Sequence, residues 1–181
     1  LTKEHGALMV CDEVQTGIFR CGTPFGFQHF GVTPDIVTMA KGIASGMPMG
    51  ACAAPAHIAK AYQPGDHGTT FGGSCLAVAA ATATLDTLSN GFQQHVQETG
   101  EYMRQQLAGV SKVKEVRGVG LMNAIDFDES VDAPALVQKA LGKGLLLNAT
   151  GAHTLRFLPP LVCEKGDIDA MVERLNQMIE A

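Results

Sequence analysis

Hydrophobic residues in the first third of the chain occur in short unbroken runs. The run Leu8–Cys11 ends at Asp12 and Glu13, and the run Asp35–Ala40 ends at Lys41. Apolar runs without polar alternation are typical of strands that are covered on both faces of a parallel sheet. We therefore predict two buried strands, each of which carries a charged residue at its carboxyl end.

Helical periodicity dominates the second half of the chain. Phe92, Val96, Met103 and Leu107 are spaced by four and seven residues, which predicts an amphipathic helix. The stretch 76–88 is alanine-rich and apolar on all sides, so we expect a buried helix there. Further predicted helices lie at 56–62, 132–141 and 168–179, and further strands at 51–54, 113–117, 121–127, 145–147 and 154–158.

Composition and charge narrow the function classes. The chain has 181 residues, of which 46% are hydrophobic and 17% charged, and its net charge is −5. Because there is no basic run, nucleic acid is not an expected partner. No apolar segment reaches the length of a membrane span, and no signal peptide is visible. Five cysteines without C-x-x-C spacing suggest scattered buried thiols, a reducing cytoplasm and no metal site.

The two strand ends suggest a chemistry. Ligands of parallel sheets bind beyond the carboxyl ends of the strands, where Asp12 and Lys41 are expected. A carboxylate and a lysine beside a glycine-rich loop suit a Schiff-base site. An alternative is an NTPase core, in which Asp12 would serve a magnesium ion, but the chain contains no phosphate-binding G-x-x-x-x-G-K-[ST] loop. Lys41 taken alone also fits an ordinary surface lysine.

A turn rich in hydroxyls and glycines occupies Thr69–Gly73, just before the predicted helix at 76–88. Hydroxyls and free N–H groups at a helix start suit phosphate oxygens. A simple threonine or serine cap explains the same residues equally well. Two arginines, Arg20 and Arg156, are candidates for binding a carboxylate, although a structural ion pair or a place on the rim of a site is the simpler interpretation of each.

Several further motifs follow one another along the chain, namely Asp12–Gly17 with Arg20 and Gly22, Gly31–Asp35, Ala40–Gly42, His67–Gly73, Val116–Met122 and Leu155–Leu161. Together these motifs resemble the class III, ornithine-type, pyridoxal-phosphate aminotransferases, over essentially the whole chain. One departure is visible, because the family usually has Asn-Pro where this chain has Ser74 and Cys75.

The resemblance implies roles for individual residues. Lys41 would form the Schiff base with pyridoxal 5′-phosphate and move the substrate proton, and Asp12 would pair with the pyridine nitrogen. Val14 would pack on the ring, and Gln15 would lie near the phenolic oxygen. Thr70 would bind the phosphate held by the partner subunit of a homodimer, and Arg156 would bind the substrate carboxylate.

The resemblance also implies a fold and a reaction. The fold would be the α/β, aspartate-aminotransferase-like fold type I. Residues 1–90 would form the C-terminal part of the large parallel-sheet domain, and residues 91–181 a small α+β domain. The reaction would move an amino group from N-acetylornithine to 2-oxoglutarate in arginine biosynthesis. Ornithine, succinylornithine or 4-aminobutyrate are alternative donors.

Family members are much longer, so we expect this chain to be the C-terminal part of an enzyme and to be inactive alone. A binding or dimerisation module without catalysis is the alternative.

Overall fold

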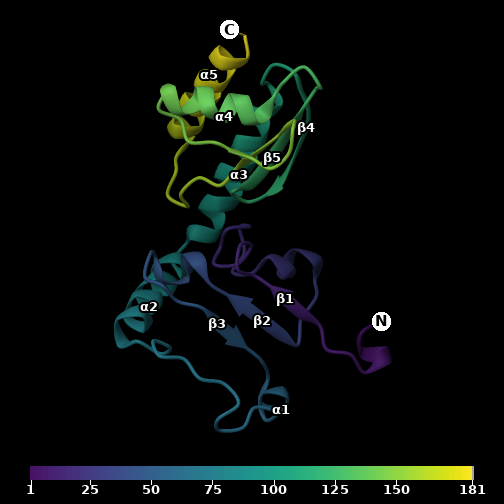
Figure 1. Ribbon diagram of the computed structural model, residues 1–181, viewed down its shortest axis with the longest axis vertical. Helices are drawn as coiled ribbons and strands as arrows, with labels where there is room; N and C mark the ends of the chain where they lie inside the picture. Colours follow the sequence, from purple (N-terminus) through teal and green to yellow (C-terminus); the bar gives the residue numbers. More distant parts are fainter. Residues whose placement is uncertain (181) are drawn as a thin grey trace. The chain divides into compact units, whose positions relative to one another are not determined.

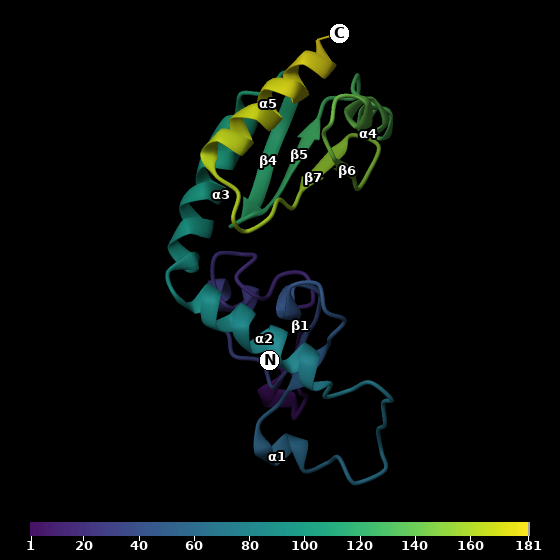
Figure 2. The ribbon, with the colours of Figure 1, turned by 90° about the vertical axis from the view of Figure 1, so that its left-hand side faces the viewer.

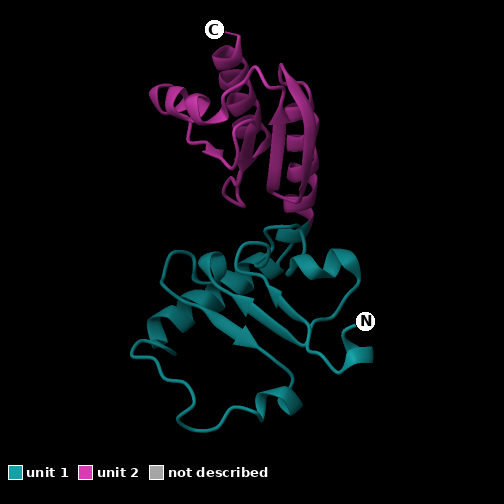
Figure 3. Cartoon of the chain, turned by 45° about the vertical axis from the view of Figure 1, so that its right-hand side comes forward, with its two compact units in different colours: residues 1–93 teal, residues 94–181 magenta. Residues whose placement is uncertain are grey.

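The computed structural model describes residues 1–180, which form two compact units, one from Leu1 to Gln93 and one that begins at Gln94 (Figure 3). The first unit contains one small sheet, four short helices and one 15-residue helix, and the second contains another sheet with three helices. The proposed division of the whole protein into domains near Asn90 stays a prediction.

The first sheet consists of β1 (Val10–Asp12), β2 (Ile36–Met39) and β3 (Ala51–Ala53), in that order (Figure 1). β1 and β2 are parallel, with Asp12 opposite Thr38, whereas β3 runs antiparallel to β2. The two predicted strands are therefore confirmed as neighbours, and their carboxyl ends lie at the same edge of the sheet.

The predicted burial of β1 on both faces is wrong for this chain. Leu8 is 54% exposed and Val10 is 56% exposed. Within residues 1–180, β1 is an edge strand that pairs only with β2. An unbroken apolar run predicts a strand, but the burial of that strand depends on what packs against it.

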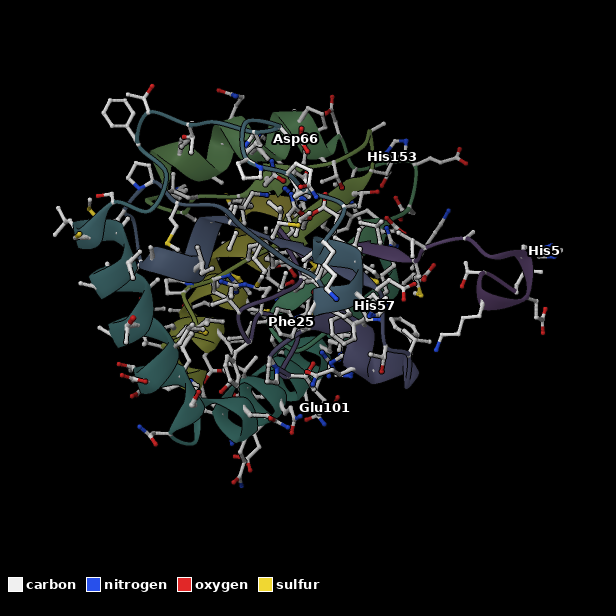
Figure 4. The ribbon with its side chains drawn as sticks, turned by 90° about the horizontal axis from the view of Figure 1, so that it is seen from below. His5, Phe25, His57, Asp66, Glu101 and His153 are labelled. Atoms are coloured by element: carbon white, nitrogen blue, oxygen red, sulfur yellow. The ribbon has the colours of Figure 1, made fainter. Side chains whose placement is uncertain are left out.

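Helix α2 (Cys75–Ser89) has the predicted position but not the predicted burial. Only Ala77, Ala81 and Leu88 are buried, whereas Leu76 is 66% exposed. The short elements of this unit are η1 (Lys3–His5, with His5 labelled in Figure 4), η2 (Gly26–Phe30), η3 (Lys41–Ala44) and α1 (Ala56–Ala59).

The second sheet is antiparallel throughout and has the order β4-β5-β7-β6. Its strands are β4 (Val113–Val119), β5 (Met122–Phe127), β6 (Asn148–Ala149) and β7 (Thr154–Phe157), and its helices are α3 (Phe92–Ala108), α4 (Ala133–Gly142) and α5 (Lys165–Ile179) (Figure 2). The predicted strand at 145–147 is wrong. Pairing begins at Asn148, opposite Arg156, and Leu146 is 85% exposed.

One hydrophobic core holds the second unit together. Buried residues of α3, α4 and α5 pack with alternate residues of β5 and β7, which agrees with the amphipathic helix predicted at α3. The side chain of Asp132 accepts a hydrogen bond from Ala135 N at 3.0 Å and so caps the N-terminus of α4. No helix within residues 1–180 is long and apolar enough to cross a membrane.

An ion pair on this sheet predicts acid sensitivity. Arg117 on β4 binds the carboxylate of Asp126 on β5, and the hydroxyl of Thr154 donates to the same carboxylate at 2.6 Å. The Arg117 hydrogen bond, followed by that from Thr154, lowers the pKa of Asp126. Because the folded pKa lies below the unfolded value of about 3.9, the pair stabilises the fold above that pH, and this stabilisation is lost as the pH falls through the lower, folded value.

We expect Asp126→Asn to remove about 0.5–1 kcal/mol at neutral pH, since the pair is partly exposed, and much less near pH 2. Denaturant unfolding of both proteins at the two pH values measures the difference. An equal loss at both values would contradict the assignment.

Candidate active site

The candidate site lies at the carboxyl edge of the first sheet. Asp12 is the last residue of β1, and Lys41 follows the end of β2 after Ala40. Both are exposed. Because the two strands are adjacent and parallel, the structure brings the predicted carboxylate and the predicted amine to the same edge.

Within the described residues, hydrogen bonds reach only one of the two oxygens of the Asp12 carboxylate. Its Oδ1 accepts a hydrogen bond from Val14 N at 3.0 Å and another from Thr38 Oγ1 at 3.2 Å. Within the described residues, Oδ2 accepts none. The turn that begins at Asp12 also places Val14, which is half-buried, and Gln15, which is exposed, just beyond β1. The sequence did not single out Thr38, because alignment of the two strands by their charged ends would pair Asp12 with Lys41, whereas the structure pairs Asp12 with Thr38.

Lys41 has an unusual backbone conformation. Its φ of 52° lies in the left-handed region, and it is the first residue of η3. For a residue with a Cβ this conformation costs on the order of 1–3 kcal/mol, and such residues are concentrated at functional sites. Ile43 and Ala44 are buried and anchor the same turn. Lys41 is therefore an exposed residue at the start of a turn that is held in place by the burial of Ile43 and Ala44.

Glu13 has a structural role. It is only 4% exposed, and its carboxylate accepts three hydrogen bonds. Their donors are the hydroxyl of Thr16 at 2.6 Å, Gly26 N at 2.8 Å and Phe27 N at 2.9 Å. These bonds tie the aromatic loop after β1 to the strand end. The rings of Phe25 and Phe27 stack in the same loop at 5.3 Å, and Figure 4 labels Phe25.

Replacing Glu13 with glutamine should lower the free energy of unfolding by about 2–3 kcal/mol. The amide has one acceptor oxygen, so its NH₂ group would face the N–H of Gly26 or Phe27. Denaturant unfolding followed by circular dichroism measures the loss. Glu4→Gln is the matched control, because Glu4 is exposed in the same unit. Equal stability of the two variants would show that the carboxylate is not needed.

The cysteines only partly follow the prediction of buried thiols. Cys21 and Cys163 are buried, Cys11 is intermediate, and Cys52 and Cys75 are exposed. Burial, together with the carboxylate of Glu13, raises the pKa of the Cys21 thiol, so this thiol stays protonated near neutral pH. Among residues 1–180, no three His, Cys, Asp or Glu side chains come close enough together to hold a metal ion.

A hollow in the first unit adjoins the threonine-glycine turn. Its lining includes Pro48–Gly50, His67, Thr69 and the residues that lead into α2. Thr70 itself is exposed and does not line the hollow. Arg156 lies in the second unit, half-buried on β7 and opposite Ala124 and Asn148. The roles predicted for Thr70 and Arg156 stay predictions.

The residues at the sheet edge fit pyridoxal phosphate. Asp12 Oδ2 is available to accept a hydrogen bond from a protonated ring nitrogen, and Lys41 offers an exposed amine for an aldehyde. Hydroxyls and glycine N–H groups before α2 suit a phosphate. These three kinds of group correspond to the ring nitrogen, the aldehyde and the phosphate of the cofactor.

Comparison with known proteins identifies the family. The family model described as aminotransferase class-III matches residues 1–179. The chain belongs to this family. Class-III aminotransferases depend on pyridoxal phosphate, which agrees with the fit of the sheet edge. The α/β fold, with a mixed sheet and an antiparallel sheet, is therefore that of the pyridoxal-phosphate aminotransferases.

Relatives in this family include acetylornithine and ornithine aminotransferases. The chain is 46% identical to acetylornithine aminotransferase of Corynebacterium efficiens over 99% of its own length and 44% of the relative's. It is 41% identical to acetylornithine aminotransferase of Bacillus subtilis, over 98% of its own length and 46% of the relative's.

Solved structures of aminotransferases also match this chain. A crystal structure of acetylornithine aminotransferase from Elizabethkingia anophelis matches with a TM-score of 0.89 and 34% identity, over 99% of this chain and 49% of that one. An ornithine delta-aminotransferase of Plasmodium falciparum matches with a TM-score of 0.88 and 32% identity, over 99% and 47%. The chain thus spans less than half the length of these relatives.

Proposed function

We propose that the protein carrying this chain is an aminotransferase that moves an amino group from N-acetylornithine, or a related ω-amino acid, to 2-oxoglutarate. The observation that carries the proposal is the delivery of Asp12 and Lys41 to one sheet edge by adjacent parallel strands, in a class-III chain. The names of the relatives support N-acetylornithine first and ornithine second. A cytoplasmic homodimer in arginine biosynthesis is part of this proposal.

Pyridoxal phosphate, when bound, supplies an aldehyde that condenses with amines and a ring that accepts electrons from the substrate Cα. Lys41 would hold it covalently through Nζ and, once displaced by the substrate amine, would take the proton from the substrate Cα. Asp12 would keep the ring nitrogen protonated through Oδ2.

The remaining residues would bind and orient. Val14 would pack against one face of the ring, and Gln15 would lie on its phenolic side. Thr70 would bind the phosphate across the dimer. Arg156 would hold the substrate carboxylate through the two parallel N–H groups of its guanidinium.

The experiment that tests this function is reductive labelling of the complete gene product. The protein is incubated with pyridoxal phosphate and reduced with borohydride, and its peptides are mapped by mass spectrometry. We expect a single phosphopyridoxyl group on Lys41. Labels scattered over surface lysines, or no label, would refute the catalytic role and favour a module that only binds or dimerises.

Replacing Asp12 with asparagine should lower turnover about 10²–10³-fold, because the amide keeps the shape but not the charge that faces the ring nitrogen. A steady-state assay with N-acetylornithine and 2-oxoglutarate measures the loss. Asp86→Asn, a change at an exposed position of α2, is the control. Turnover of Asp12→Asn equal to that of the control would remove Asp12 from the site.

A further inference from the structure

We infer that Thr38 is a positioning residue for the proposed cofactor site. Its hydroxyl holds one oxygen of the Asp12 carboxylate, so that the other faces the ring nitrogen. The inference rests on the proposed function and adds a residue that neither the sequence motifs nor the family resemblance assigned.

The sheet register places the two side chains together. Asp12 and Thr38 are directly paired in the parallel β1–β2 ladder. Paired residues of neighbouring strands direct their side chains to the same face of a sheet. Accordingly, Thr38 Oγ1 donates to Asp12 Oδ1 at 3.2 Å. The contact is thus a consequence of strand pairing and does not depend on a flexible loop.

The backbone of Thr38 is fixed from both sides. Its carbonyl accepts a hydrogen bond from Glu13 N at 2.9 Å, and on the other side Thr38 is paired with Cys52 of β3. Threonine is β-branched, so its χ1 angle is restricted in a strand. The hydroxyl is therefore a rigid donor on the central strand of the sheet.

The carboxylate of Asp12, in contrast, is exposed and has few restraints. Within the described residues, the hydrogen bonds to its side chain come from Val14 N and Thr38 Oγ1, and both reach Oδ1. Val14 N belongs to the turn that follows Asp12, so Thr38 is the donor from another strand. Without this hydroxyl, the carboxylate would rotate more freely, and its contact with a ring nitrogen would be less well oriented.

The test compares Thr38→Val, Thr38→Ala and Thr38→Ser in the complete gene product. Valine keeps the shape of threonine without the hydroxyl, alanine removes the hydroxyl with less bulk, and serine restores it. Thr87→Val is the matched control, because the hydroxyl of the exposed Thr87 donates to Ala83 O of its own helix at 2.8 Å and has no other hydrogen-bond partner among residues 1–180. Two readouts are used, namely the Kd for pyridoxal phosphate and the ¹⁵N shift of the ring nitrogen of labelled cofactor, followed over pH.

We expect Thr38→Val and Thr38→Ala to raise the Kd about tenfold, since a hydrogen bond to a charged group is lost. The ring nitrogen should also lose its proton at a pH about one unit lower, because a poorly oriented carboxylate supports the charge less. Thr38→Ser and Thr87→Val should stay within about twofold of the parent protein.

Each other outcome decides against the inference. A parent protein that takes up no pyridoxal phosphate would refute the proposed function and, with it, the role of Thr38. If the parent protein binds the cofactor, and Thr38→Val and Thr38→Ala have the same Kd and the same ¹⁵N titration as the parent, the inference about Thr38 is wrong. The proposed function would not be affected by that result. A raised Kd with an unchanged titration would show that Thr38 supports the fold and not the orientation of Asp12.

Discussion

Replacing Lys41 with alanine should abolish aminotransferase activity, with a loss of at least about 10⁴-fold. The change removes the amine that would hold the cofactor covalently and, with it, the base that would move the substrate proton. A steady-state assay of the complete gene product, with pyridoxal phosphate added in excess, measures the loss. The excess cofactor separates failed chemistry from weak binding.

The backbone at this position makes alanine the informative replacement. Lys41 has a φ of 52°, and alanine has the same Cβ, so the strain of the left-handed conformation stays the same. The side chain is exposed, so the free energy of unfolding should change by less than about 0.5 kcal/mol. Lys60→Ala, at another exposed lysine, is the control for charge. Activity of Lys41→Ala close to that of this control would exclude Lys41 as the catalytic amine.

The sequence predicted the positions of Asp12 and Lys41 because each follows an unbroken apolar run, and parallel strands bring their carboxyl ends to one edge. It did not predict the left-handed conformation of Lys41, since lysine has no preference for that region. It also missed the Thr38 hydroxyl, because a threonine inside an apolar run fits an ordinary strand residue.

In the fold, element type was easier to predict than burial or exact pairing. The stripe that includes Val96, Met103 and Leu107 predicted both the helix and its buried face, since all three residues are buried and the last two belong to the core of the second unit. Apolar composition also predicted burial for Leu76 on α2, but this side chain is exposed among the described residues. Leu146 lies in an apolar run that predicts a strand, but the β6–β7 pairing starts at Asn148. Burial and pairing depend on partners that local sequence does not contain.

The largest effect on stability is expected at Gly100 on α3. An ideal Cβ at this position would lie 2.0 Å from Gly120 O and 2.4 Å from Gly120 C. These are backbone atoms, which cannot rotate away as a flexible side chain can. Gly120 O also accepts hydrogen bonds from Asn123 Nδ2 at 3.0 Å and Arg104 Nη1 at 3.3 Å. Any shift that makes room for a methyl group would therefore disturb a polar network around Asn123, which is only 1% exposed.

Gly100→Ala should consequently destabilise the protein by about 3 kcal/mol or more, although alanine is the better helix former. Denaturant unfolding, with amide exchange of β4 and β5 as a local probe, measures the loss. Gly142→Ala is the matched control, because a Cβ at this last residue of α4 meets nothing within 4 Å. That variant should gain about 0.5–1 kcal/mol. If both variants gained stability, α3 would not lie against Gly120 as closely as the structure places it, and the packing of the second unit would need revision.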